Sequence, residues 1–200
     1  MATTEARKAT AETAAAPVGA DPGPLGLAGF AATTLVLGVT GAGLIDKASV
    51  AAVLPLALFY GGLGQLIAGI LEFRRGNTFG TTAFTTYGAF WLAFAFLNWS
   101  GFTKGAVPGP GVGMFLLVFA IVTGYLTIAA MRVSGAVLTV FVLLTLAFLV
   151  LAIGAFAGSD GISKVGGFIA ILTAIAAFYT SAAIVINATW KRVVLPVFPF

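Results

Sequence analysis

The sequence predicts an all-α integral membrane protein, built as a bundle of six transmembrane helices. The first observation is composition: 60% of the 200 residues are hydrophobic and 8% are charged, whereas soluble domains carry about 25% charged residues. The second is the mean hydropathy, which is +1.10 over the chain. The third is spacing, because short runs of charged and turn residues divide the chain into six apolar stretches.

Each apolar stretch is long enough to cross a bilayer, since a helix needs about 20 apolar residues to span the hydrocarbon core. We expect spans at Leu25–Ile45, Val50–Phe73, Phe79–Trp99, Val112–Met131, Ala136–Ala157 and Val165–Thr189. The predicted domains are a polar cytoplasmic tail (1–23), a six-helix transmembrane domain (24–190) and a short C-terminal tail (191–200).

The basic residues predict the orientation. One side of the membrane would hold seven of them: Arg7, Lys8, Arg74, Arg75, Arg132, Lys191 and Arg192. The other side would hold three, Lys47, Lys104 and Lys164. The richer side is expected to be cytoplasmic, so both termini would be cytoplasmic in a multi-pass protein of the plasma or inner membrane. Because the charges are scattered, we expect the lipid bilayer as a partner and no nucleic acid.

The missing residue types exclude several kinds of chemistry. The chain has no cysteine and no histidine, so disulfides, thiol chemistry and the commonest proton shuttle are absent. No nucleophile–base pair, carboxylate dyad or metal-ligand cluster is visible in the sequence. We therefore expect no enzyme, no catalytic residue, no bound metal and no cofactor.

One face of the second span carries small and polar residues at helical spacing: Leu58, Gly61, Gly62, Gln65, Ala68, Gly69 and Glu72. Small residues let membrane helices approach closely, and a buried amide needs hydrogen-bond partners. The face should therefore point inward. Gln65 and Glu72 would be polar contacts between helices or the lining of a passage, and Glu72 could also form a rim ion pair with Arg74 and Arg75.

The third span has two faces that do not suit lipid. Five threonines cover an arc of about 140° on a helix: Thr78, Thr81, Thr82, Thr85 and Thr86. A threonine can bond the carbonyl of its own preceding turn, so the arc fits helix packing or a hydroxyl-lined path. Tyr87 points the opposite way, and its phenol needs a partner, so it should face a cavity or another helix.

Similar strips mark the first span (Phe30, Thr33, Thr34, Leu37, Gly41) and the sixth (Thr173, Thr180, Asn187). Together they predict a mildly polar, uncharged interior that suits the passage of something small. Proton-coupled carriers usually hold an ionisable residue near mid-membrane, and none is present. If a proton moves, the solute itself could carry it, as a small carboxylic acid can.

Two stretches resemble the acetate uptake transporter family, also called the succinate–acetate permease family. DPGPLGL (Asp21–Leu27) resembles that family's NPAPLGL signature, and the stretch Phe59–Trp91 resembles its second and third helices. The resemblance implies a homo-oligomer, a hexamer of six-helix bundles. It also implies transport of acetate and related short monocarboxylates, in some members succinate, by proton symport or through an anion channel.

The resemblance also implies site residues. The family's hydrophobic constriction corresponds to Phe30, Tyr87 and Leu144. We expect further pore-lining or selectivity positions at Asp21, Pro24, Leu25, Gly26, Thr33, Tyr60, Gln65, Glu72, Ala177, Thr180 and Asn187. One departure is Asp21, where the family has Asn. Asp21 would cap the first helix, with Pro22 at its first position, or repel an anion at the pore mouth.

Two alternatives stay open at this point. One is a pore for ammonia, ammonium or another small solute, which an acidic Asp21 would suit. The other is a structural membrane protein without flux, although the short loops offer little surface for partners.

Overall fold

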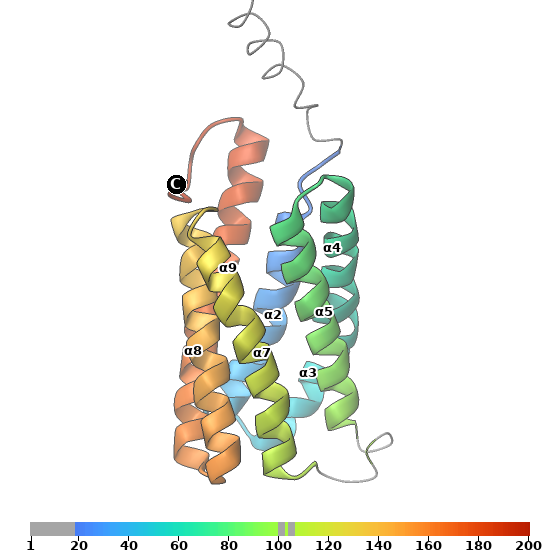
Figure 1. Ribbon diagram of the computed structural model, residues 1–200, viewed down its shortest axis with the longest axis vertical. Coiled ribbons are helices and arrows are strands. Elements are labelled where there is room, and N and C mark those ends of the chain that lie inside the picture. Colours follow the sequence, from blue (N-terminus) through green and yellow to red (C-terminus); the bar gives the residue numbers. More distant parts are fainter. Residues whose placement is uncertain (1–18, 100–102, 104–106) are drawn as a thin grey trace, which may run out of the picture.

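The computed structural model describes residues 19–99, 103 and 107–200. These residues form long helices that run along one axis (Figure 1). They contain no strand, and their isolated β-bridge joins Ser134 and Pro199. Most of the predicted N-terminal tail (1–18), with Arg7 and Lys8, lies outside the described residues, and so does Lys104.

Five predicted spans appear as single α-helices with shifted ends: α2 (Gly23–Gly41), α5 (Thr78–Asn98), α7 (Gly109–Ala130), α8 (Gly135–Ala157) and α9 (Asp160–Trp190). The largest shift is at α9, which begins five residues before the predicted Val165. Ser159 caps this helix by accepting a bond from the Ile162 amide (3.4 Å), and Asp160 lies in the first turn. Both features stabilise a helix start.

The second predicted span is not one uniform helix, which corrects the sequence prediction. It runs through a 3₁₀ turn η1 (Lys47–Ala52), α3 (Val53–Leu58), a π-helical turn η2 (Phe59–Gly64) and α4 (Gln65–Arg74). Glycine permits the wide turn to approach its neighbours: a Cβ on Gly61 would lie 2.6 Å from Thr33 Oγ1 and 2.9 Å from Trp91 Cδ1. The π turn therefore packs its backbone directly on α2 and α5.

Among the described residues, five helices are long and apolar enough to cross a membrane: Gly23–Gly41, Lys47–Arg74, Gly109–Ala130, Gly135–Ala157 and Asp160–Trp190. The helix α5 has 21 residues and so sufficient length, but it is not among the five. Its five threonines, together with glycines and a tyrosine, lower its hydropathy. A sixth crossing therefore stays a prediction.

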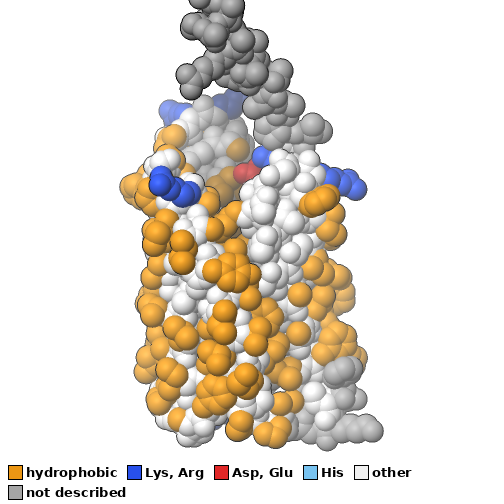
Figure 2. All heavy atoms as spheres, in the orientation of Figure 1, with side chains coloured by type: hydrophobic (Ala, Val, Ile, Leu, Met, Phe, Trp, Pro, Cys, Tyr) orange, Lys and Arg blue, Asp and Glu red, His pale blue; other side chains and the backbone are white. Residues whose placement is uncertain are grey.

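Hydrophobic side chains cover the visible flank of the bundle, and charged side chains gather at its upper end (Figure 2). The C-terminus lies at this same end (Figure 1). Arg75 Nη1 donates to the Gly19 carbonyl there (3.1 Å). Lys47, the first residue of η1, and Asp160, the first residue of α9, form an exposed ion pair at 3.1 Å.

The helix α2 is the centre of the packing, because it contacts α9, α3, η2, α4 and α5. The helices α7, α8 and α9 pack in sequence order, each on the next. By contrast, α5 and α7 contact each other little. A cavity of about 530 Å³ lies beside this weak contact, since residues of both α5 and α7 line it.

Candidate functional site

Two cavities meet inside the bundle at a narrow apolar point. The larger has a volume of about 530 Å³ and the smaller about 160 Å³. Phe30 of α2 and Leu144 of α8 line both cavities, and Tyr87 of α5 lines the smaller one. Phe30 and Leu144 therefore lie between the two cavities, and Tyr87 packs against Phe30 on the side of the smaller one. The resemblance to the family had implied these three residues as its constriction.

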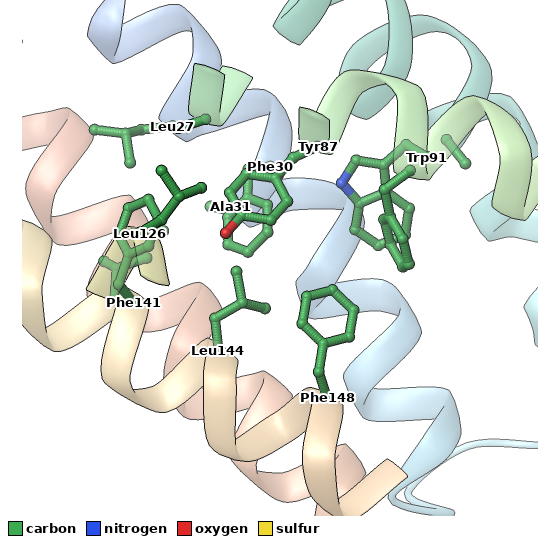
Figure 3. Packing of buried hydrophobic residues seen from close by; sticks show 14 of the residues in the cluster. Leu27, Phe30, Ala31, Tyr87, Trp91, Leu126, Phe141, Leu144 and Phe148 are labelled. Atoms are coloured by element: carbon green, nitrogen blue, oxygen red, sulfur yellow. The ribbon is translucent and has the colours of Figure 1, made fainter. Parts of the chain in front are cut away.

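The constriction is a cluster of rings contributed by different helices. The ring centroids of Phe30 and Tyr87 are 5.7 Å apart, and those of Tyr87 and Phe141 are 6.0 Å apart. Phe30, Tyr87 and Leu144 are 4%, 3% and 5% exposed, and Figure 3 shows them facing one another. The residues at the narrow point thus present apolar surface.

The hydroxyl of Tyr87 is bonded away from the passage. It donates to Thr123 Oγ1 of α7 at 3.0 Å, and Thr123 Oγ1 donates in turn to the Phe119 carbonyl at 2.6 Å. This answers the need of a buried phenol for a partner. Tyr87 therefore acts in the constriction mainly through its ring.

The smaller cavity opens toward the charged end and carries the acidic groups, Asp21 and Glu72. Glu72 is 3% exposed. Asn77 Nδ2 donates to Glu72 Oε2 at 3.0 Å, and the Arg75 Nε lies 4.0 Å from the same oxygen. The predicted rim ion pair therefore involves Arg75, and Asn77 makes the shorter contact.

Asn77 and Asp21 line the mouth of the smaller cavity, by which we mean its end near the charged residues, and both bind backbone amides at helix starts. Asn77 Oδ1 accepts the Gly80 amide at 3.1 Å, so Asn77 caps α5 while it holds Glu72. Asp21 Oδ1 accepts the Gly23 amide at 2.9 Å. The predicted register is wrong by one residue: Pro22 is the N-cap of α2, and Asp21 lies before it and binds the amide of the first helical residue.

Gln65 lines the smaller cavity, and its side-chain oxygen accepts no hydrogen bond from the described residues. The residue is 1% exposed, and its Oε1 has no hydrogen-bond partner among the described residues. Buried polar atoms usually have a partner. A water or a passing solute with a donor group would satisfy this oxygen.

The larger cavity is lined mainly by aromatic and aliphatic side chains, and none of the lining residues that the structure describes is charged. Phe90 is central: it contacts the rings of Trp91, Phe94, Phe115, Phe119 and Phe148 at 4.8–6.1 Å. Polar lining comes from a few neutral residues, including Thr34 and Asn98. An amphipathic neutral solute fits such walls better than an ion does.

Six of the predicted site residues line these cavities: Asp21, Phe30, Gln65, Glu72, Tyr87 and Leu144. Eight line neither: Pro24, Leu25, Gly26, Thr33, Tyr60, Ala177, Thr180 and Asn187. Several of the eight have packing roles. Gly26 lies directly against the Phe84 ring, and Thr33 Oγ1 donates to the Gly29 carbonyl at 2.9 Å. The Pro24 carbonyl accepts Ser181 Oγ at 2.8 Å.

The other residues that line neither cavity are buried in the core, exposed on the surface of the bundle or bound to the C-terminal tail. Ala177 is fully buried in the core, and Thr180 Oγ1 donates to the Ala176 carbonyl at 2.8 Å. Leu25 and Tyr60 are 40% and 37% exposed. Asn187 binds the C-terminal tail: its Nδ2 donates to the Leu195 carbonyl, and its Oδ1 accepts the Val194 and Leu195 amides, at 2.7, 2.7 and 3.0 Å.

Sequence reasoning missed three residues of the site: Asn77, Thr123 and Phe141. Asn77 directly precedes a helix, which is an N-cap signal, and that signal would have found it. Thr123 and Phe141 carry no such signal, because their roles depend on which helix faces Tyr87. The threonine arc of α5 fits packing instead of a passage, since Thr85 lies against Gly69 of α4 and none of the five threonines lines either cavity.

The known proteins that this chain resembles are named as acetate transporters or channels. The chain is 36% identical over 181 residues to the succinate-acetate/proton symporter SatP of Escherichia coli (strain K12), covering 89% of this chain and 95% of that protein. It is 37% identical over 198 residues to acetate permease A of Emericella nidulans, covering 90% and 66%. A solved structure titled as the bacterial acetate channel SatP matches with a TM-score of 0.84 at 36% identity, covering 89% of this chain and 98% of that one.

A family model covers nearly the whole chain. The model of the GPR1/FUN34/yaaH family matches residues 6–200, which include both cavities and the constriction between them. The relatives cover most of the chain at more than a third identity. The chain is a member of the GPR1/FUN34/yaaH family.

Proposed function

We propose that this protein is a membrane transporter or channel for acetate and related short monocarboxylic acids, and not an enzyme. The observation that supports the proposal is the cluster of Phe30, Tyr87 and Leu144: Phe30 and Leu144 line both cavities, and Tyr87 lines the smaller one. Its walls suit a compact solute with an apolar end. The names of the relatives, a succinate-acetate symporter and an acetate permease, support the same substrate class.

The charges around the route favour the protonated acid as the species that crosses the constriction. Among the described residues that line the two cavities there is no lysine or arginine, whereas Asp21 and Glu72 line the smaller one. A bare carboxylate would meet like charges at this mouth and would then lose its water without gaining a cation. A neutral acid avoids both costs and carries its own proton.

The architecture of the proposed transporter follows the sequence predictions. The helix α5 would be the sixth crossing, since two of its polar residues contact neighbouring helices inside the bundle: Tyr87 contacts Thr123 of α7, and Thr85 contacts Gly69 of α4. Both termini would be cytoplasmic, because the predicted order of the spans assigns five basic residues to the same side as the two tails: Arg74, Arg75, Arg132, Lys191 and Arg192. The resemblance to the family supports assembly as a hexamer in the plasma or inner membrane.

Acetate flux in proteoliposomes tests the function and the permeating species together. The purified chain is reconstituted, and uptake of labelled acetate is measured over a pH series, with and without an imposed membrane potential. Passage of the neutral acid rises as the pH falls and ignores the potential. Flux that follows the potential would mean anion conduction, and no flux above empty liposomes would refute acetate transport.

Transport of ammonium is the second candidate, because the acidic mouth would attract a cation. Asp21 and Glu72 both line the smaller cavity, and one relative at 38% identity is named ammonia transport outward protein 2, from Saccharomyces cerevisiae. Competition between labelled acetate and ammonium in the same liposomes separates the two. Ammonium flux without acetate flux would favour this candidate.

A further inference from the structure

The C-terminal tail (191–200) folds back on the bundle. The helix α9 ends at Trp190, and the next residue, Lys191, has a left-handed backbone with φ 52°. A left-handed residue after the last turn is a common way to end a helix and redirect the chain. Figure 1 shows the tail arching from the end of α9 toward α8, and its Pro199 forms a β-bridge with Ser134 before α8.

Two side chains of α9 hold the first half of the tail. The Asn187 amide makes three hydrogen bonds to the backbone of Val194 and Leu195. The Tyr179 hydroxyl donates to the Pro196 carbonyl at 2.7 Å, and Tyr179 is 38% exposed. Because water competes for exposed hydrogen bonds, their net contribution is small. This half of the tail is therefore held by contacts that can open individually.

The second half of the tail completes the start of α8. The first amides of a helix have no partner within that helix. In α8 the Gly135 amide donates to the Phe198 carbonyl at 2.7 Å, and the Ala136 amide donates to the Val197 carbonyl at 3.2 Å. Glycine permits this approach, since a Cβ on Gly135 would lie 3.1 Å from the Phe198 Cβ. The tail therefore bridges the end of α9 and the start of α8.

The residues that the tail binds lie beside residues that line the smaller cavity. Val133 and Val137 flank the two bound amides of α8, and both line this cavity. Ile184 also lines it and precedes Asn187 by three residues on α9. Other lining residues come from α2, α4 and α5 across the cavity. The tail thus binds one wall of the smaller cavity, near its mouth.

This wall is free to move relative to the opposite one. The helix α7 packs extensively on α8, and α8 on α9, whereas α5 and α7 contact each other little. The bound tail also carries local strain, because Phe198 has φ 53°, which is unfavourable for a residue with a side chain. Strain and exposed bonds both favour release of the tail without unfolding of the helices.

We propose that the C-terminal tail is a clasp that regulates access to the smaller cavity. The bound tail holds the start of α8 against α9 and keeps the mouth narrow. Its release lets the turn between α7 and α8 move away from α2 and α5, so that solute enters faster. The effect on flux rests on the proposed function, whereas the change in access does not. Size selection stays with Phe30, Tyr87 and Leu144.

Thiol labelling tests access without relying on flux, because the chain has no cysteine. Val140→Cys puts a thiol at a 2% exposed position in the smaller cavity. Adding Asn187→Ala should speed its reaction with N-ethylmaleimide in detergent by about tenfold, and Tyr179→Phe by less, because lost hydrogen bonds raise the released population. Leu116→Cys, in the larger cavity, is the control and should react at an unchanged rate. An unchanged rate at position 140, or an equal rise at both positions, would overturn the clasp.

A disulfide between the tail and α8 supplies the second measurement. Gly135→Cys with Phe198→Cys suits one, since the 3.1 Å between the Cβ positions is close to the usual separation of about 3.5–4.5 Å. Acetate flux of the oxidised double variant in proteoliposomes should be lower than after reduction by about fivefold or more, because the released state is removed. The ratio of butyrate to acetate flux should not change, and neither single variant should respond to reductant.

The outcomes separate the clasp from the transport function. If the double variant carries acetate equally well oxidised and reduced, the clasp is refuted while the transport function stands. Absence of acetate flux in the unsubstituted protein would refute the proposed function, and the labelling rates at position 140 would then decide the clasp alone.

Discussion

The hydroxyl of Tyr87 donates a 3.0 Å hydrogen bond to Thr123 Oγ1, and this bond ties α5 to α7 where the two helices otherwise contact each other little. The Tyr87 ring simultaneously packs on Phe30 of α2 and Phe141 of α8. Four helices therefore hold one side chain at the narrowest point between the cavities. The Tyr87 ring narrows the space between the cavities, and the hydrogen bond from its hydroxyl to Thr123 fixes the position of the ring.

Removal of the ring should widen the constriction. Tyr87→Ala is expected to raise the ratio of butyrate to acetate flux by about tenfold, because discrimination of a methylene in an apolar site is worth about that much. Tyr87→Phe keeps the ring and should leave the ratio close to that of the unsubstituted protein. The ratio is measured with labelled acids in proteoliposomes. A butyrate preference unchanged in Tyr87→Ala would show that the ring does not limit solute size.

Removal of the partner should destabilise the fold. Thr123→Val leaves the buried Tyr87 hydroxyl unpaired, which costs about 1–3 kcal/mol. The double change Tyr87→Phe with Thr123→Val removes both polar groups and should recover part of the loss. Thermal unfolding in detergent measures the effect, with Thr139→Val as the control because its exposed hydroxyl bonds only the Gly135 carbonyl. Equal stability of the single and double variants would contradict this coupling.

The small-residue face of the second span shows what periodicity could predict. Gly61, Gly62, Gln65, Ala68, Gly69 and Glu72 were expected to point inward, and all six are buried. Leu58, from the same predicted face, is partly exposed. The π turn within this span was not predictable, because a π turn is selected by contacts between helices rather than by local propensity.

The site shows a similar division between local and long-range information. Periodicity predicted that Tyr87 faces a cavity or another helix. The resemblance to the family predicted that Phe30 and Leu144 form the constriction with it. Thr33 and Thr34 are adjacent in sequence, yet the hydroxyl of Thr33 is hydrogen-bonded and that of Thr34 is buried without a partner among the described residues. Only the position of each residue around α2 separates them. Likewise, nothing local to Asn187 indicates that a tail eight residues away returns to bind it.

Close approach of α4 and α5 depends on Gly69. A Cβ at this position would lie 2.5 Å from Thr85 Cγ2 and 2.9 Å from the Thr85 amide nitrogen, which cannot move aside. Gly69→Ala should therefore cost about 1–3 kcal/mol through overpacking. Gly124→Ala is the control, because nothing lies within 4 Å of its added Cβ, and alanine favours a helix by up to about 1 kcal/mol. Similar melting temperatures for both variants would contradict the contact.

Asn77 joins the cap of α5 to the carboxylate of Glu72, and two substitutions separate these roles. Asn77→Ala loses both and should cost about 1 kcal/mol for the cap alone. Asn77→Asp keeps an acceptor for the Gly80 amide but places a second carboxylate beside Glu72. Its destabilisation should be largest at neutral pH and shrink as the pH falls, because protonation of one carboxyl removes the repulsion. Unfolding of both variants at several pH values checks this, and a pH-independent loss in Asn77→Asp would contradict the proximity of the two groups.

The amide of Asn187 makes three hydrogen bonds to the tail at residues 194 and 195. Asn187→Ala should free the tail and speed tryptic cleavage after Arg192 by about tenfold or more, since each lost bond raises the open population. Thr180→Ala is the control, because its hydroxyl bonds only the Ala176 carbonyl. Tyr179→Phe should give a smaller increase, since Tyr179 donates a single bond to the Pro196 carbonyl. The same variants decide between the two roles of Asn187. Unchanged cleavage with altered acetate selectivity would support pore lining, whereas faster cleavage with unchanged selectivity would assign Asn187 to the tail.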